Sequence, residues 1–244
     1  MVNASLLIIG DEILSGRTQD KNLGYLAKWL NEAGIQLAEV RVVPDIEQEI
    51  IDAVNALRAK HDYVFTTGGI GPTHDDITSE SIAKAFARKH MIHPEAFRRL
   101  EVHYAEGDFT KARQRMAHTP EGAELVDNPV SIAPGFQVEN VFVLAGVPKI
   151  MQAMLEQLRP RLKGGKTILS ETLAIHAPES EMAEVLQNIE AAHDGLSVGS
   201  YPFFRDGAVG TEIVVRSADA CRIKSAMSDL KVFCQQQSYS CSIV

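Results

Sequence analysis

The stretch YVFTTGGIGPTHDD, residues 63–76, decides the fold. Residues 63–67 form a short apolar run of the kind typical of a buried strand. Gly68, Gly69 and Gly71 follow; glycines let the backbone approach a ligand closely and turn its amides toward it. Thr78 then opens a helix, whose N-terminus favours an anion. This order predicts a ligand-binding loop at the edge of a parallel sheet.

The same alternation of strand and helix extends toward the N-terminus. Apolar runs predict further strands over residues 5–9 and 37–43, and apolar residues at helical spacing predict helices over residues 20–33 and 46–58. Strands joined by crossover helices imply a parallel sheet. The turns that follow the three strands then lie on one edge, where open α/β sheets bind ligands.

The remainder of the chain divides into two parts. We expect an irregular helical segment over residues 94–116, a hairpin over residues 136–144 in which Asn140 takes positive φ, and a helix from Pro148. Gly164-Gly165 resembles a linker. A smaller pattern follows, with strands over residues 167–175, 196–201 and 211–215, and helices over residues 178–193 and 219–233. The predicted fold is α/β: a three-layer αβα domain with a mostly parallel sheet over residues 1–165, and a small α+β (βαββα) domain over residues 166–244.

The composition restricts the class of protein. The chain has 244 residues, of which 45% are hydrophobic and 23% charged, enough for a sizeable core. Its net charge of -8, with no run of Lys or Arg, argues against a nucleic-acid partner. Three cysteines without CxxC spacing argue against a disulfide framework. No basic N-terminal region and no long apolar stretch are present, so we expect a cytoplasmic protein with no membrane partner.

Carboxylates follow each of the three strands. Asp75 and Asp76 end the glycine-rich loop, Asp11 and Glu12 follow the first strand, and Asp45 follows the second. The simplest way to combine such carboxylates with an anionic ligand is a bridging divalent metal. Ordinary turn chemistry is the alternative, and Asp45 alone is typical of the N-cap of the next helix.

Three basic side chains are further candidates. His74 is a proton shuttle or an exposed loop residue. Arg113 and Arg115 reach phosphate or lie on an exposed helix face. The sequence contains no Walker A motif, G-x-S-x-G or H-E-x-x-H, and the other histidines have no metal-ligand spacing.

Several short motifs occur in one order along the chain. They are Gly10-Asp11-Glu12, Ser15-Gly16, Asp45, the loop GGIGPTHDD at 68–76, Arg115, Glu121-Gly122-Ala123, Asn128-Pro129, Ala133-Pro134-Gly135-Phe136 and Gly146-Val147-Pro148. In these residues the chain resembles the molybdenum-cofactor biosynthesis (MoCF, MoaB/MogA-like) domain family. Pro72 and the double Asp are similar to the subgroup that contains the N-terminal domain of CinA and that of eukaryotic FAD synthases. The resemblance covers about residues 4–165, and the tail is similar to that subgroup's small extension, so a stand-alone member is expected.

The resemblance implies two chemistries. Members of the family bind molybdopterin, and some adenylylate it with the Asp that aligns with Asp76. The CinA-like subgroup is associated with metal-dependent hydrolysis of nucleotide pyrophosphates such as ADP-ribose or FAD. We therefore expect a divalent-metal-dependent nucleotide pyrophosphatase. The alternatives are a molybdopterin-binding or adenylylating protein and a non-catalytic binding module.

The expected site follows from these motifs. Asp76 and Asp75 are the catalytic candidates. The candidates for substrate or phosphate binding are Gly68, Gly69, Gly71, Thr73, Gly10, Ser15, Arg115 and Gly146. The candidate ligands for Mg²⁺, Mn²⁺ or Co²⁺ are Asp76, Asp45, Asp11 and Glu12. The expected partners are a small nucleotide or pterin and further copies of the chain, as a dimer or trimer. Phe97, Tyr104 and Phe109 are either part of that interface or ordinary core.

Overall fold

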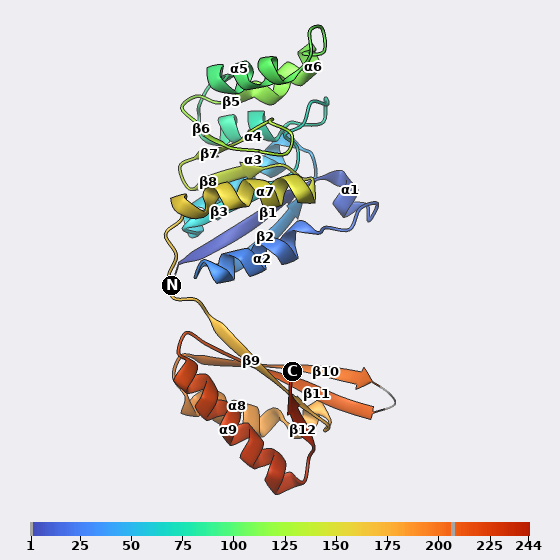
Figure 1. Cartoon of the computed structure of the whole chain (residues 1–244), viewed down its shortest axis with the longest axis vertical. Coiled ribbons are helices and arrows are strands. Elements are labelled where there is room, and N and C mark those ends of the chain that lie inside the picture. Colours follow the sequence, from blue (N-terminus) through green and yellow to red (C-terminus); the bar gives the residue numbers. More distant parts are fainter. Residues whose placement is uncertain (1, 206–207) are drawn as a thin grey trace. The chain divides into compact units, whose positions relative to one another are not determined.

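A six-stranded sheet organises the first of two compact units, Met1–Gly165, in the computed structural model, which describes residues 2–205 and 208–244 (Figure 1). The strand order is β2-β1-β3-β8-β7-β6. The strands are β1 (Asn3–Ile9), β2 (Gln36–Val43), β3 (Tyr63–Thr67), β6 (Glu124–Val126), β7 (Gly135–Val138) and β8 (Val141–Leu144). The first four in this order are parallel, whereas β7 runs antiparallel to both β8 and β6. The predicted mostly parallel sheet is confirmed.

The order of the strands creates a switch point between β1 and β3. The chain passes from β1 to β2 on one side and then returns to β3 on the other side of β1. Loops that follow strands at such a point diverge and leave a crevice at the carboxyl ends of the strands. Here these loops begin at Gly10 and Gly68.

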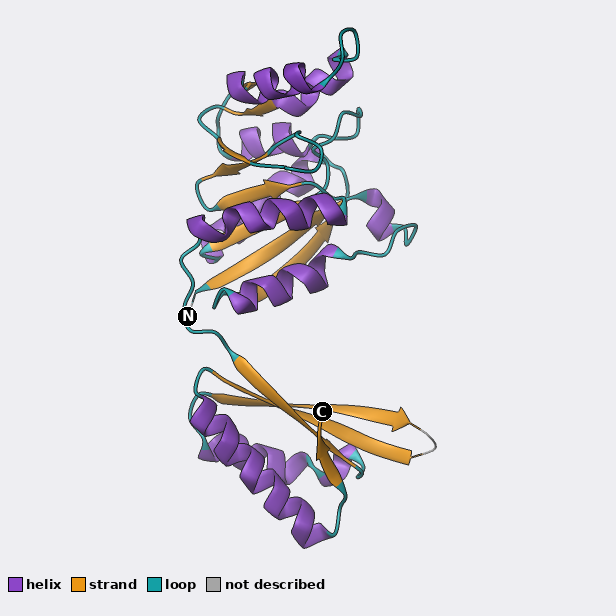
Figure 2. Ribbon diagram, viewed as in Figure 1, coloured by secondary structure: helices purple, strands orange, loops and turns teal. Residues whose placement is uncertain are grey.

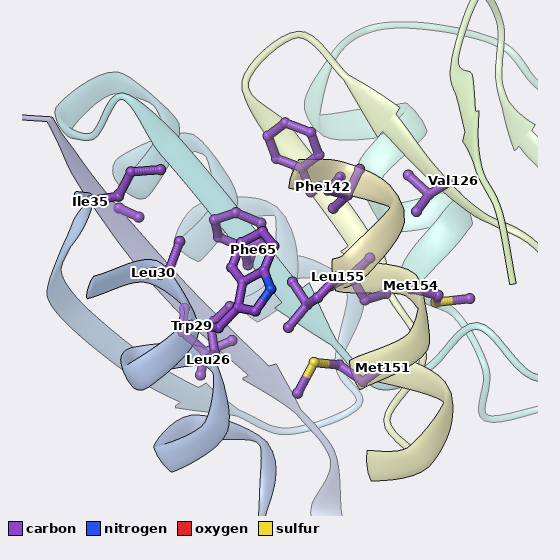
Figure 3. Close-up of a cluster of buried hydrophobic side chains, with 14 of the residues drawn as sticks. Leu26, Trp29, Leu30, Ile35, Phe65, Val126, Phe142, Met151, Met154 and Leu155 are labelled. Atoms are coloured by element: carbon purple, nitrogen blue, oxygen red, sulfur yellow. The ribbon is translucent and has the colours of Figure 1, made fainter. Parts of the chain in front are cut away.

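Helices cover both faces of this sheet (Figure 2). Helices α2 (Asn22–Glu32) and α7 (Pro148–Leu158) pack on one face, and α3 (Glu47–Lys60) and α4 (Thr78–Ala85) pack on the other. The unit also contains α1 (Asp11–Leu14), α5 (Pro94–His103) and α6 (Lys111–Gln114). Side chains that alternate along β1 enter two cores, because successive residues of a strand point to opposite faces. Leu6 packs with α2 and α7, whereas Leu7 packs with α3 and α4. Figure 3 shows the first core, where Trp29 of α2 lies beside Leu155 of α7.

Two local predictions were wrong. In the β7–β8 hairpin, Glu139 takes the positive φ of 51°, not Asn140. The Asn140 side chain instead donates to the carbonyls of Arg58 and His61 at 3.0 and 2.9 Å, which ties the turn to the end of α3. The N-cap of α3 is Ile46 rather than Asp45.

The segment 94–116 is interrupted rather than continuously helical. It contains α5, α6 and a 3₁₀ turn, Arg115–Ala117. Two short strands flank this segment and pair with each other, β4 (His90–Ile92) and β5 (His118–Pro120). This pairing was not predicted, because strands of three residues have no readable period.

The second unit, Lys166–Val244, contains a separate antiparallel sheet with the order β10-β11-β9-β12. Its elements are β9 (Leu169–Ile175), a 3₁₀ turn (Glu179–Glu181), α8 (Ala183–Ala192), β10 (Leu196–Arg205), β11 (Ala208–Ser217), α9 (Ala220–Gln237) and β12 (Cys241–Ile243). The helices pack on one face of the sheet through a core that includes Leu173, Ile213 and Leu230 (Figure 2). The βαββα order is confirmed, and β12 is an additional strand. In neither unit does a described helix combine the length and apolar character needed to span a membrane.

Candidate functional site

The glycine-rich loop crosses the switch point so closely that side chains are excluded. Gly68 has φ +105°, and a Cβ there would lie 2.1 Å from the carbonyl oxygen of Ile9. The amide of Gly68 donates to the carbonyl of Leu144 at 3.3 Å. A Cβ on Gly146 would lie 3.2 Å from the Cα of Gly68. The loop is therefore held between the carboxyl ends of β1 and β8, where only glycine fits.

Beyond Gly68 the loop presents unpaired amides. The backbone N–H groups of Gly69, Ile70 and Gly71 donate to no other group among the described residues. Gly69 has φ +66°, and the hydroxyl of Thr78, at the start of α4, donates to the Gly68 carbonyl at 3.0 Å. Successive free amides beside a helix N-terminus favour an anion. The Gly68 amide, predicted to bind phosphate with the others, is already occupied.

The carboxylate of Asp76 is held in place from within the same loop. The backbone amide of Thr73 donates to Asp76 Oδ2 at 2.8 Å, and the Thr73 hydroxyl donates to the same oxygen. A Cβ on Gly71 would lie 2.7 Å from Oδ2, so glycine is needed beside this carboxylate. Thr73 therefore orients Asp76 rather than lining the hollow where a ligand fits.

A hollow of about 510 Å³ opens in front of this loop, within the size range of ligand pockets. Its walls come from five segments that lie far apart in sequence. They contain Glu12 and Thr18, Gly68–Pro72 and Asp76, Met116, residues between Asn128 and Ala133, and residues between Ala145 and Ile150. Predicted site residues thus lie in one pocket with Asn128, Ser131 and Ala133, which carried no predicted site role.

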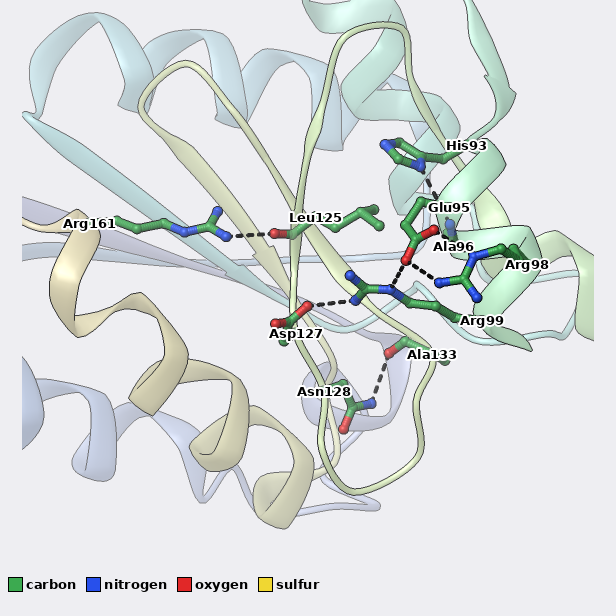
Figure 4. Close-up of polar contacts among 10 residues, drawn as sticks. All are labelled: His93, Glu95, Ala96, Arg98, Arg99, Leu125, Asp127, Asn128, Ala133 and Arg161. Atoms are coloured by element: carbon green, nitrogen blue, oxygen red, sulfur yellow. Dashed lines mark hydrogen bonds and ion pairs between the residues drawn. The ribbon is translucent and has the colours of Figure 1, made fainter. Parts of the chain in front are cut away.

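Two walls of this hollow are tied down by buried or charged contacts. Asn22 is 4% exposed, and its side-chain amide donates to the Gly146 carbonyl at 2.8 Å. The amide of Asn128 donates to the Ala133 carbonyl at 2.8 Å, while Asp127 pairs with Arg99 of α5 at 2.6 Å (Figure 4). The loops that face the glycines are therefore anchored to α2 and α5.

A second hollow of about 230 Å³ adjoins the first. Both are lined by Ile70, Gly71, Asp76 and Met116, so Asp76 lies in the wall between them. The second hollow is also lined by Arg115, whose Nη2 donates to the Asp76 carbonyl at 3.5 Å. This is the one predicted basic residue that reaches the site.

Acidic side chains gather on the same edge of the sheet. Asp45 Oδ2 accepts from the Asp11 amide at 3.0 Å. The pKa of Asp45 is raised, first by burial and then by the charges of Asp11, Glu12 and Asp75. The local negative charge around Asp45 is thus only partly balanced, which favours a nearby cation.

The structure brings together only part of the predicted site. Gly68, Gly69, Gly71, Asp76, Glu12, Gly146 and Arg115 line the two hollows. Gly10, Ser15, Thr73, Asp75, Asp11 and Asp45 line neither of them in the described structure. The backbone amide of Asp11 donates to the Asp45 carboxylate, and Ser15 is exposed at the end of α1. Gly10 leaves room for Glu12, whose carboxylate would lie 2.6 Å from a Cβ there.

Other candidates lie outside the hollows. His74 is 96% exposed at its side chain. Arg113 donates to the Asp108 carbonyl at 2.5 Å and lies over the ring of Tyr104. Phe97 and Tyr104 both pack on Phe109, with ring centroids 5.0 and 5.9 Å away, so they form a small core beneath α5.

Sequence reasoning missed His90, His118 and Ser79, which line the second hollow. The two histidines lie on β4 and β5, which pair only in the folded chain. Their separation in sequence carries no metal or catalytic spacing, so no local signal identified them.

Comparison with known proteins identifies the first unit. The family described as the probable molybdopterin binding domain matches residues 5–164. The chain belongs to this family. A relative from Pyrococcus horikoshii is 36% identical over 203 residues, which cover 77% of this chain and 80% of the relative. Another from Archaeoglobus fulgidus is 34% identical over 197 residues, covering 81% and 84%.

A solved structure shows the same architecture in the first unit. The crystal structure of CinA from Thermoplasma acidophilum is 36% identical, with a TM-score of 0.62, and the match covers 65% of this chain and 96% of that one. A more distant likeness is to MoaB from Thermus thermophilus, which is 19% identical with a TM-score of 0.45, covering 66% and 92%. Residues 167–240 of this molybdopterin-binding-domain protein match the middle domain of FAD synthase.

Proposed function

We propose that this chain is a divalent-metal-dependent pyrophosphatase that splits the phosphoanhydride of an AMP-containing dinucleotide, such as ADP-ribose or FAD. The match of residues 167–240 to the middle domain of FAD synthase makes FAD-like dinucleotides a reasonable class of substrate to test. A dinucleotide has two bulky halves joined by a short anionic link. Two adjoining hollows that share one narrow wall match this shape.

The observation that carries the proposal is the position of Asp76. Its carboxylate lies in the wall between the two hollows, beside the free amides of Gly69, Ile70 and Gly71. Amides bind phosphate oxygens, whereas a lone carboxylate repels them. A cation between phosphate and carboxylate removes this conflict.

The oxygen donors at the wall fit a divalent cation. Among the described residues, no three His, Cys, Asp or Glu side chains form a ready-made metal cluster. Mg²⁺ is commonly held by one or two carboxylates together with substrate phosphates. Asp76 and Glu12 both line the larger hollow and would hold it, whereas Asp11 and Asp45 line neither hollow. The bound ion would polarise a phosphoryl oxygen and lower the pKa of water.

The protein's own residues supply the remaining steps of the proposed reaction. The three free amides orient the anhydride, and Thr73 holds Asp76 in place through Oδ2. The Arg115 guanidinium stabilises the charge that grows on the departing phosphate, since it lines the second hollow beside Asp76.

The test is a screen of nucleotide pyrophosphates with Mg²⁺, Mn²⁺ and Co²⁺, with AMP release as the readout. Asp76→Asn is expected to lower kcat by about 100-fold or more, a loss typical of a group that stabilises transition-state charge. Asp75→Asn is the matched control, because this neighbouring carboxylate is exposed and lines neither hollow. An Asp76→Asn protein with wild-type turnover would refute the proposal, and a tightly bound nucleotide without any product would indicate a binding module.

Pterin binding is the second candidate, supported by the family's description as a probable molybdopterin binding domain. The same hollow and free amides suit a pterin that carries a phosphate. Adenylylation then requires that ATP is consumed only when the pterin is present. Calorimetry that detects no pterin binding would reject this candidate.

A further inference from the structure

The second hollow contains two imidazoles that the proposed reaction does not use. His90 of β4 and His118 of β5 lie with their ring centroids 5.3 Å apart, and both line this hollow beside Asp76. Ser79, in the first turn of α4, contacts both residues. These contacts determine which ring nitrogens carry hydrogen.

Ser79 fixes the tautomer of His90. The Ser79 hydroxyl donates to the carbonyl oxygen of His118 at 2.8 Å, which uses its single hydrogen. Its contact with His90 Nε2 at 3.1 Å is therefore one in which Nε2–H donates to the hydroxyl. The lone pair of neutral His90 is then on Nδ1.

A backbone carbonyl does the same for His118. Nδ1 of His118 lies 3.2 Å from the carbonyl oxygen of Gln114, which can only accept, so Nδ1 carries the hydrogen. The lone pair of neutral His118 is on Nε2. Neither His90 Nδ1 nor His118 Nε2 has a partner among the described residues.

The hollow is therefore rich in acceptors. Two imidazole lone pairs join the carboxylates of Glu80 and Asp76, whereas Arg115 is its only lining Lys or Arg in the described chain. The pKa of His90 is lowered, first by burial and then by His118. An imidazole nitrogen with a free lone pair accepts a hydrogen from a ligand hydroxyl or amino group.

We propose that this hollow is a recognition subsite for a sugar or polyol phosphate, in which His90 Nδ1 and His118 Nε2 accept from ligand hydroxyls and Arg115 binds the phosphate. The inference rests on the proposed function, which places the anhydride at Asp76 and one half of the dinucleotide in this hollow. Ribose in ADP-ribose and ribityl in FAD both present hydroxyls next to phosphate. His90 and His118 would thus select hydroxylated leaving groups.

The experiment measures binding without turnover. Dissociation constants for ribose 5-phosphate and methyl phosphate are compared by calorimetry on the full chain, since both carry the phosphate and only the first carries the sugar hydroxyls. The wild type is expected to prefer ribose 5-phosphate by about 10-fold or more, as two neutral hydrogen bonds would give. Because no anhydride is cleaved, this preference is independent of whether the chain is a hydrolase.

Two variants remove the acceptors and keep the packing. His90→Phe and His118→Phe each retain an aromatic ring at the contact between these two residues and remove both ring nitrogens. Each is expected to reduce the preference about five-fold while methyl phosphate binding stays unchanged. His103→Phe, on the exposed side of α5 outside this hollow, is the matched control.

The outcomes separate the two proposals. Equal binding of both probes by the wild type would overturn the subsite, as would a preference that survives in both folded variants, with folding checked by thermal unfolding. A chain that prefers ribose 5-phosphate but splits no pyrophosphate would contradict the proposed hydrolysis and leave the subsite standing.

Discussion

Thr73 donates twice to one oxygen of Asp76, from its backbone amide at 2.8 Å and from its hydroxyl. Both bonds end on Oδ2, and Oδ1 has no partner among the described residues. Two donors on one oxygen hold the carboxylate in a single orientation. The loop thus leaves Oδ1 of Asp76 without a donor at the wall between the hollows.

Thr73→Val should lower activity without unfolding the protein. The substitution removes the hydroxyl but keeps the shape and the backbone bond, so Asp76 loses only part of its restraint. We expect kcat to fall about 10-fold, in line with the loss of one hydrogen bond to a charged group. Steady-state AMP release measures the effect, and Thr73→Ser, which keeps the hydroxyl, should remain close to wild type. Equal rates for the Val and Ser variants would contradict the orienting role.

Gly68→Ala should destabilise the first unit strongly. A Cβ at this position would lie 2.1 Å from the Ile9 carbonyl oxygen, at φ +105°. We expect the free energy of unfolding to fall by about 3 kcal/mol or more, because both backbone strain and a steric clash are introduced. Denaturant unfolding provides the measurement.

Gly24→Ala is the matched control for that experiment. Gly24 lies in α2, where a Cβ would meet nothing within 4 Å. Alanine in a helix is favoured over glycine by about 1 kcal/mol, so this variant should be slightly more stable than wild type. If both alanine variants shifted stability in the same direction, the close approach of Gly68 to the Ile9 carbonyl would be refuted.

Asn22→Ala should weaken ligand binding as well as stability. The buried Asn22 amide is the donor that holds the Gly146 carbonyl at 2.8 Å, and Gly146 lines the larger hollow. We expect unfolding free energy to fall by about 1 kcal/mol and KM to rise, because the Gly146 carbonyl loses its donor and the loop is released. Asn188→Ala, on the exposed side of α8, should change neither quantity. An unchanged KM in a folded Asn22→Ala protein would show that the loop is held by other contacts.

Glu39 should give the first unit a distinct sensitivity to acid. Contacts with Lys60 at 2.6 Å, His61 at 3.1 Å and Arg41 at 2.8 Å lower the pKa of this β2 carboxylate from 4.5 to about 2. A carboxyl whose folded pKa lies below its unfolded pKa stabilises the fold above the unfolded value and loses this contribution as pH falls. The loss should therefore occur between about pH 4.5 and pH 2.

Thermal unfolding of Glu39→Gln measures this contribution. The variant should have a lower Tm at pH 7 and a flatter decline of Tm below pH 4.5, the unshifted pKa of this carboxyl. Glu106→Gln, at an exposed position, should follow the wild-type curve. Parallel curves for wild type and Glu39→Gln would mean that solvent screens these contacts completely.

Much of the site could be predicted because it depends on local backbone chemistry. A glycine-rich loop after an apolar strand must turn sharply and expose amides, and Asp76 lies only a few residues further along the same loop. The roles of Thr73 and Asp45 could not be predicted in this way. The bonding partners of Thr73 and Asp45 depend on the path that each of their loops takes in the folded chain. The same side chains can cap a helix, bind a ligand or hold a neighbouring group in place.

The sequence by itself determined the alternation of strands and helices, the parallel sheet and the position of the glycine loop at its edge. These features follow from apolar periodicity and from glycine's freedom at φ values that other residues avoid. Only the tertiary structure decided that Asp76 separates two hollows and that His90 and His118 meet beside it. Two long-range contacts build this part of the site: β4 pairs with β5, and residues 128–150 return to the glycine loop. The free energy that stabilises these contacts comes from packing throughout the core, so no local motif predicts them.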